Sequence, residues 1–141
     1  MSDSFELAGF VLIVHSRQFP DAHDCWDGNW LVVTCSCRAP GSYVEVKGPI
    51  VRLDEIAHLQ KCLEELQNGS QTKYELNCME PELSLAFKMD DKGRLKFVVQ
   101  LTPDNLNQSH VTSFFIDQSY LPVAIQQCKS ILENYPIRTE H

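Results

Sequence analysis

The sequence predicts an α+β fold, a single two-layer domain in which a mainly antiparallel, twisted β-sheet carries two amphipathic helices packed on one face. Apolar and polar residues alternate with period two over much of the chain, which is typical of antiparallel strands with one buried face. Two segments, 54–68 and 117–135, instead have apolar residues at helical spacing. The length of 141 residues and the hydrophobic content of 43% suit one globular domain. We therefore expect one domain over residues 1–141.

Four segments of the N-terminal half predict extended structure: Leu7–Val14, Trp30–Cys37, Ser42–Lys47 and Ile50–Leu53. Arg38–Gly41 is expected to turn the chain between the second and third of them. Gly48-Pro49 is expected to break the ladder before the fourth, because proline donates no backbone hydrogen bond.

The first helix is predicted to follow directly. Asp54 is a suitable N-cap, and Glu55 suits the positive end of the helix dipole. Asn68-Gly69 supplies a left-handed stop. The apolar stripe of this helix consists of Ile56, Leu59, Leu63 and Leu66.

The second half is predicted to be a meander of strands followed by a second helix. The alternating segments are Lys73–Cys78, Glu82–Met89, Leu95–Leu101 and His110–Ile116. Asp90–Gly93 turns the chain between the second and third, and a loop, Thr102–Ser109, precedes the last. The second helix is expected to begin at Asp117–Ser119, to tolerate Pro122 in its first turn and to end before Pro136.

The segment Phe19–Trp30 is the most informative part of the chain. Asp21, Asp24 and Asp27 recur every third residue among the aromatic residues, and a proline, a glycine and an asparagine exclude a long helix or strand. We expect an ordered surface loop. Tryptophan beside carboxylates suits protein recognition, because aromatic side chains supply desolvated anchors and carboxylates steer a basic partner.

The charge balance narrows the class of partner. The chain has 19 acidic residues against 12 lysines and arginines, a net charge of −7. This argues against direct binding of nucleic acid, whose phosphates require basic side chains, and is compatible with a basic protein partner. The simpler interpretation is that the acidic charge serves only solubility.

The N-terminal sequence indicates a cytoplasmic protein with no membrane association. No basic residue precedes the apolar run at Leu7–Val14, which is too short to span a bilayer and lacks the features of a signal peptide. The six cysteines are then expected to remain reduced.

No catalytic, cofactor or metal site is predicted. Cys25, Cys35 and Cys37, with His23 nearby, have spacing that matches zinc sites poorly, and Cys35 and Cys37 are better interpreted as small apolar fillers of the core. The spacing of the three aspartates does not fit a calcium loop. The chain contains neither a G-x-S-x-G elbow nor a P-loop, so we expect no enzyme.

The order of several motifs resembles the WapI family of bacterial immunity proteins. Those motifs are Phe19–Asp21, Trp26–Leu31, the leucine spacing from Leu53 to Gly69, Glu82–Leu85 and Phe115–Leu121. The resemblance implies a cytoplasmic antitoxin that binds the toxic C-terminal domain of a contact-dependent or secreted polymorphic toxin, often a nuclease, and holds it inactive.

Within that hypothesis we assign partner binding to Asp21, Asp24, Trp26 and Asp27. Trp26 is equally compatible with an interface or a core position, whereas Trp30, which begins a strand, favours the core. The polar face of the sheet is also left free for a second copy, as in a homodimer. Two alternatives stay open. The first is a non-catalytic binding module or a subunit of a cytosolic assembly, and the second, which the sequence favours less, is a small metal-dependent enzyme.

Overall fold

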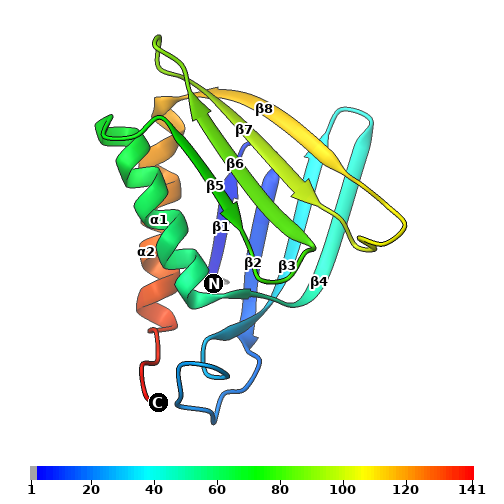
Figure 1. Cartoon of the computed structure of the whole chain (residues 1–141), viewed down its shortest axis with the longest axis vertical. Helices are drawn as coiled ribbons and strands as arrows, with labels where there is room; N and C mark the ends of the chain where they lie inside the picture. The colour runs from blue at the N-terminus through cyan, green and yellow to red at the C-terminus, as the bar shows by residue number, and fades with distance from the viewer. Residues whose placement is uncertain (1–2) are drawn as a thin grey trace.

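The chain alternates four strands and a helix, twice over (Figure 1). This computed structural model describes residues 3–141 and confirms the α+β class. The first unit contains β1 (Asp3–Leu7), β2 (Phe10–Arg17), β3 (Trp30–Ala39), β4 (Ser42–Arg52) and α1 (Leu53–Asn68). The second contains β5 (Lys73–Asn77), β6 (Leu83–Met89), β7 (Arg94–Leu101), β8 (Val111–Asp117), a 3₁₀ turn (Gln118–Tyr120) and α2 (Leu121–Asn134).

The strands form two antiparallel sheets of four, in the orders β1-β2-β3-β4 and β5-β6-β7-β8. We expected one sheet; the observed division follows from α1, which carries the chain away from β4 before β5 begins. A period-two pattern identifies which face of a strand is buried but not which strands pair, so it contains no information about this division.

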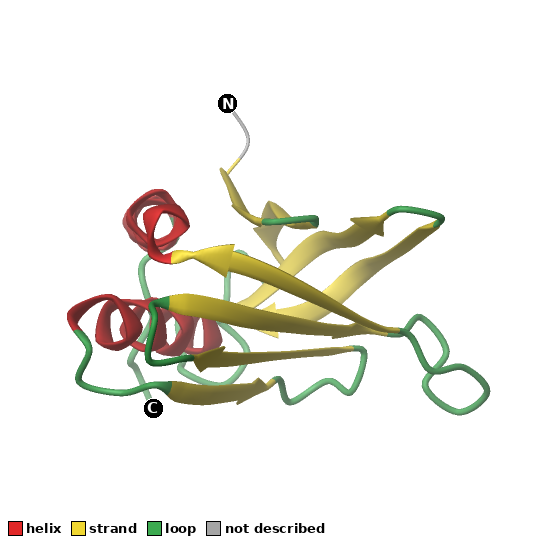
Figure 2. Ribbon diagram, turned by 90° about the horizontal axis from the view of Figure 1, so that it is seen from above, coloured by secondary structure: helices red, strands yellow, loops and turns green. Residues whose placement is uncertain are grey.

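The buried faces of the two sheets share one core, in which aromatic rings join the layers. Phe97 of β7 is stacked on Phe87 of β6 with 4.9 Å between ring centroids, and it meets Phe10 of β2 edge-on at 6.3 Å. Seen from above, the sheets lie as successive layers with both helices on one side (Figure 2). α1 and α2 pack against each other, α2 against β1 and α1 against β5.

The predicted strand Leu7–Val14 is wrong, because a tight turn divides it between β1 and β2. Ala8 takes a left-handed conformation (φ 53°) so that Leu7 and Phe10 pair directly. A Cβ atom at Gly9 would lie only 2.0 Å from the Arg38 carbonyl oxygen. The hairpin is not visible in the hydropathy pattern, because its turn residues are themselves small and apolar.

The predicted break at Gly48-Pro49 is an interruption of the β3–β4 pairing and not the end of a strand, because β4 continues to Arg52. The register of β3 against β4 shifts between Leu31 and Val33, so Val32 lies opposite two residues of β4. Such a bulge leaves the proline outside the regular ladder and lets the strand resume.

The helices confirm most of the predicted boundaries. α1 begins two residues early, with Arg52 as its N-cap, so Asp54 lies in the first turn. Glu55 closes this end instead, its carboxylate accepting the Arg52 N–H at 2.8 Å. Gly69 (φ 79°) ends the helix as expected. At the second helix, the Asp117 carboxylate accepts the Ser119 N–H at 2.8 Å.

Candidate partner-binding site

The segment between β2 and β3 folds against the last residues of the chain, at one end of the molecule (Figure 1). We call residues 18–29 the acidic loop, residues 136–141 the tail, and their shared exterior the loop–tail surface. The Cys25 N–H donates to the Glu140 carbonyl at 2.7 Å, and Asp24 and Glu140 form a short parallel bridge. Residues more than a hundred positions apart in sequence therefore build one surface.

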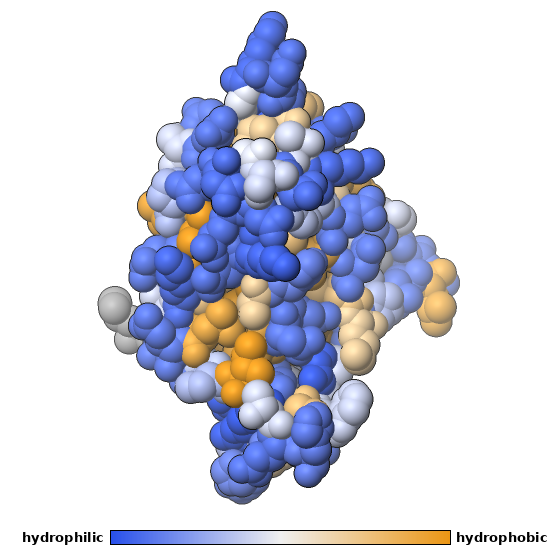
Figure 3. Space-filling model, turned by 60° about the vertical axis from the view of Figure 1, so that its left-hand side comes forward, coloured by the Kyte–Doolittle hydropathy of each residue, from blue (hydrophilic) through white to orange (hydrophobic). Residues whose placement is uncertain are grey.

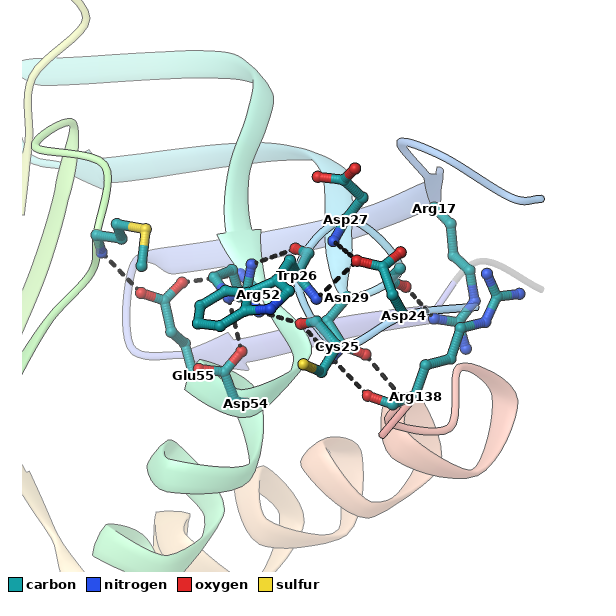
Figure 4. Close-up of polar contacts among 12 residues, drawn as sticks. Arg17, Asp24, Cys25, Trp26, Asp27, Asn29, Arg52, Asp54, Glu55 and Arg138 are labelled. Atoms are coloured by element: carbon teal, nitrogen blue, oxygen red, sulfur yellow. Dashed lines mark hydrogen bonds and ion pairs between the residues drawn. The ribbon is translucent and has the colours of Figure 1, made fainter. Parts of the chain in front are cut away.

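Three arginines from different parts of the chain hold this segment in place (Figure 4). Each donates guanidinium N–H groups to two backbone carbonyls. Arg17 donates to Gly28 (2.6 Å) and Pro136 (2.5 Å), Arg52 to Cys25 and Trp26 (2.8 Å each), and Arg138 to Pro20 (2.9 Å) and Ala22. Burial and the neighbouring Arg138 lower the pKa of Arg17.

Asn29 is the buried polar centre of the loop. Its side-chain amide donates to the carbonyls of Cys25 (3.1 Å) and Arg138 (2.9 Å), and its Oδ1 accepts the Arg138 N–H at 2.8 Å. The Asn29 side chain is only 2% exposed, and backbone groups satisfy both its donors and its acceptor. These hydrogen bonds hold the acidic loop against the tail.

Arg52 connects the loop to the body of the protein. Its Nε donates to Asp54 at 2.9 Å, and its guanidinium carbon lies 5.0 Å from the centroid of the Trp30 ring. Glu55 extends the network, since its second carboxylate oxygen accepts the Met79 N–H at 2.7 Å. Burial raises the pKa of Glu55, while these backbone donors oppose the rise. The hydrogen bonds of Arg52 and Glu55 therefore join the acidic loop, the start of α1 and the β5–β6 connection into one framework.

The residues predicted to bind a partner all lie on the acidic loop, but they differ in role. Trp26 is 69% exposed, and Asp21 and Asp27 are exposed. Asp24 is engaged internally, because its carboxylate accepts the N–H groups of Trp26 (3.1 Å) and Asp27 (3.0 Å). The pKa of Asp24 is lowered, and the hydrogen bond from the Asp27 N–H contributes most to this shift. Trp30 is half-buried beneath Arg52.

Beside Trp26 the surface is hollowed by about 340 Å³, between the acidic loop, Arg52 and the tail. Phe19 and Ile137 add apolar surface, 44% and 39% exposed. The side of the molecule that includes the helices is mostly hydrophilic, with apolar side chains gathered in separate patches (Figure 3). An exposed tryptophan beside a hollow and among carboxylates can anchor a protein partner.

The framework residues Arg17, Asn29, Arg52 and Arg138 were not predicted from the sequence. Most of their partners are backbone groups, and several contacts span more than a hundred residues. Only the Asp-Gly-Asn tripeptide before Trp30 indicated an ordered turn here.

The cysteine interpretation is confirmed for Cys35 and Cys37, which face the core with Leu31 and Val33. Burial raises the pKa of the Cys35 thiol to about 12. Cys25 lies apart from them, with its sulfur 3.4 Å from Nδ1 of His141. Over residues 3–141, no three histidine, cysteine, aspartate or glutamate side chains gather as ligands of a metal ion. Neither α1 nor α2, the helices of the described chain, combines the length and hydrophobicity needed to cross a bilayer.

Comparison with known proteins gives a fold and a family. No curated protein matches the chain. Among solved structures, MRP1/MRP2 of Trypanosoma brucei is 11% identical with a TM-score of 0.52, covering 96% of this chain and 88% of that one. The plant transcriptional regulator PBF-2 is also 11% identical, with a TM-score of 0.50 and coverages of 96% and 89%. At these identities the likeness extends to the fold alone.

A family model resolves the relationship further. The model of the immunity protein WapI-like family matches residues 4–136, which include both four-strand units, both helices and the acidic loop. The resemblance inferred from the motif order is confirmed. The chain belongs to the WapI-like immunity protein family.

Proposed function

We propose that this protein acts in the cytoplasm by binding the toxic domain of its cognate toxin and blocking it through the loop–tail surface, without catalysis. Membership of an immunity family implies a toxin partner and is the observation that supports this proposal. Nothing in the mechanism requires a cofactor, since inhibition by occlusion needs only affinity and shape.

The loop–tail surface suits tight binding because it is pre-organised. Arg17, Arg52 and Arg138 each fix two backbone carbonyls, so little loop entropy remains to be lost when a partner docks. Trp26 stands exposed on this rigid base and supplies the large apolar anchor typical of interface hot spots.

The charge of the surface favours a basic partner. Asp21 and Asp27 project from the loop, Asp54 and Glu140 are exposed nearby, and the whole chain has a net charge of −7. Nuclease domains need basic clefts for phosphate, and an acidic surface can enter such a cleft and accelerate capture. We therefore propose a nuclease as the toxin.

Co-expression with the toxin domain encoded beside this gene tests the proposal. The wild-type chain should protect the cell and co-elute with the toxin domain on a sizing column. Replacing Trp26 by alanine, or Asp21 and Asp27 by lysine, should weaken the complex by about tenfold or more. Asp24 is left unchanged because its carboxylate shapes the loop.

The matched control reverses two exposed acids on other parts of the molecule, Glu45→Lys with Asp91→Lys. This variant has the same net charge as the double loop variant, so it separates a local contact from a general charge effect. Equal loss of protection in both would place the binding surface elsewhere. A cell that dies although soluble wild-type protein is present, with no complex formed, would refute the proposed function itself.

A further inference from the structure

We infer that the free edge of β8 is a second docking site, which takes an extended, carboxylate-bearing segment of a partner protein as an added strand. This goes beyond the toxin site proposed above, and it rests on β8 and the outer face of the β5–β8 sheet.

The edge of β8 is unpaired in the described chain. β8 pairs with β7 and with no other strand of residues 3–141, whereas the opposite edge of the same sheet, β5, lies against α1. The β1 edge of the other sheet is likewise covered by α2, where Gln127 accepts the Glu6 N–H at 2.8 Å.

Alternate backbone groups of β8 point away from the sheet. The Leu101 N–H donates to the His110 carbonyl at 3.2 Å, just ahead of the β7–β8 ladder. Continuing the register, Thr112, Phe114 and Ile116 hydrogen-bond to β7. The N–H and C=O groups of Val111, Ser113 and Phe115 are then directed outward, as a template for another strand.

The sequence of β8 lacks the usual protection of an edge. Natural edge strands contain lysine or proline, or are very short, to prevent unwanted pairing. β8 has seven residues, VTSFFID, with neither lysine nor proline. Val111 and Phe115 are 59% and 67% exposed on its outer face. The edge of β8 is therefore available for pairing with a strand of another chain.

The charge beside the edge indicates what the occupant contains. Lys73, Lys88 and Lys96 lie directly opposite one another on three adjacent strands, and Phe115 of β8 completes the row. Like charges in adjacent cross-strand positions repel. Glu75 of β5 shares the outer face with these lysines, and Lys96 is the lysine nearest to β8. Arg94 has acidic neighbours already, since it lies 3.5 Å from Asp90 and opposite Asp117.

These features favour an acidic peptide over other occupants. A second copy pairing through β8 would bring only Asp117 as a further acid to the lysines, whose acidic neighbours within the chain are Glu75 and Asp90. A nucleic acid would satisfy the lysines but has no peptide groups for the outward N–H and C=O of β8. A carboxylate-bearing strand beside β8 can pair with these backbone groups and can reach Lys96, which lies one strand in from the edge.

The test uses a monomeric, end-capped peptide of about nine alternating valine and glutamate residues. Its binding to the full chain is followed by fluorescence anisotropy, alongside a valine–lysine peptide and an oligothymidylate of similar length. The glutamate peptide should bind, with infrared amide I bands of added strand, and the other two should not. Preferential binding of the oligothymidylate would overturn the inference in favour of a nucleic-acid site.

Two variants separate backbone pairing from charge. Ser113→Pro removes an outward N–H without removing a bond to β7 and should weaken peptide binding about tenfold or more. Lys88→Glu with Lys96→Glu should do the same, while the control Lys47→Glu with Lys129→Glu, of equal charge change and at exposed positions on β4 and α2, should not. Circular dichroism and Tm confirm that each variant is folded.

Unchanged binding by both test variants would refute the inference. So would a wild-type dimer that Ser113→Pro dissociates, because the second copy would then be the occupant. Trp26→Ala should leave the affinity for the peptide unaltered, because Trp26 lies on the loop–tail surface. Peptide binding therefore tests the β8 site alone, and toxin binding tests the loop–tail surface alone.

Discussion

Asn29 and Arg138, separated by 109 positions in sequence, exchange two hydrogen bonds: the asparagine amide donates to the Arg138 carbonyl at 2.9 Å, and the Arg138 N–H donates to Asn29 Oδ1 at 2.8 Å. A single buried side chain thus performs the pairing that a strand ladder would otherwise provide. It couples the shape of the acidic loop to the position of the tail.

Replacing Asn29 by alanine should lower the free energy of unfolding by about 2 kcal/mol, because buried carbonyl and N–H groups lose their partner. Asn29→Asp keeps the size and the acceptor but loses the donors, so it should be destabilising as well. Urea denaturation measures both, and amide hydrogen exchange should show faster opening of Cys25 and Arg138. Wild-type exchange at these amides would contradict the proposed coupling.

Replacing Arg52 by methionine should cost about 2–3 kcal/mol, since the carbonyls of Cys25 and Trp26 lose charge-assisted donors. Arg52→Lys keeps the charge but cannot reach both carbonyls and Asp54 at once, so it should restore only part of the loss. Full rescue by lysine would mean that charge, not the geometry of the guanidinium, matters. Thermal unfolding of the three proteins distinguishes these cases.

Phe97 should be among the most sensitive core positions. Its ring contacts Phe10, Phe87 and Phe114 and is fully buried, so Phe97→Ala should lower stability by about 4 kcal/mol. Phe115→Ala provides a control of identical chemistry on the outer face of β8, where 67% exposure predicts a loss below about 0.5 kcal/mol. Similar losses in chemical denaturation would contradict the assignment of the two faces.

The cysteine thiols should fall into a fast and a slow class in their reaction with a thiol reagent. Cys25 is half-exposed on the loop, whereas burial raises the pKa of Cys35 and Cys128 to about 12 and of Cys62 to about 11. A thiol reagent at about pH 8 should therefore modify Cys25 first, because the thiolate is the reactive form. Cys25→Ser should remove the fast phase, and denaturant should release the buried thiols. Rapid modification of Cys35 in the native protein would contradict its burial.

The Asp24 carboxylate should make part of the stability dependent on pH. Its pKa is lowered from the ordinary 3.8 by hydrogen bonds to backbone N–H groups, so the folded state binds its proton less readily than the unfolded state does. The contribution is complete above that ordinary value and is lost as the pH falls through the lowered one. In acid titrations of Tm, wild type and Asp24→Asn should converge below about pH 4. A constant difference at every pH would contradict this role.

The elements of the fold were largely predictable from the sequence, because they depend on local patterns. The stripe from Ile56 to Leu66 predicted α1, and the alternation around Phe97 predicted β7 within one residue of its start. The error at Ala8-Gly9 and the continuation of β4 past Pro49 have local causes too: an apolar two-residue turn and a bulge that accommodates proline.

The candidate site was predictable only in part. Exposed Trp26, Asp21 and Asp27 lie on the expected surface loop, because the composition of that segment excluded regular structure. The framework was not predictable, since Arg17, Arg52 and Arg138 bond to backbone carbonyls, which every residue offers and no sequence pattern distinguishes.

The bond between Asn29 and Arg138 also imposes an order on synthesis. A nascent chain emerging from the ribosome contains the acidic loop long before Arg138 and Glu140 have been translated. Until then the loop lacks its hydrogen bonds to these two residues. Ribosome-bound chains stalled before residue 138 should therefore be unable to capture a toxin that the released protein captures. Protection would begin only once residues 138–140 have left the ribosome.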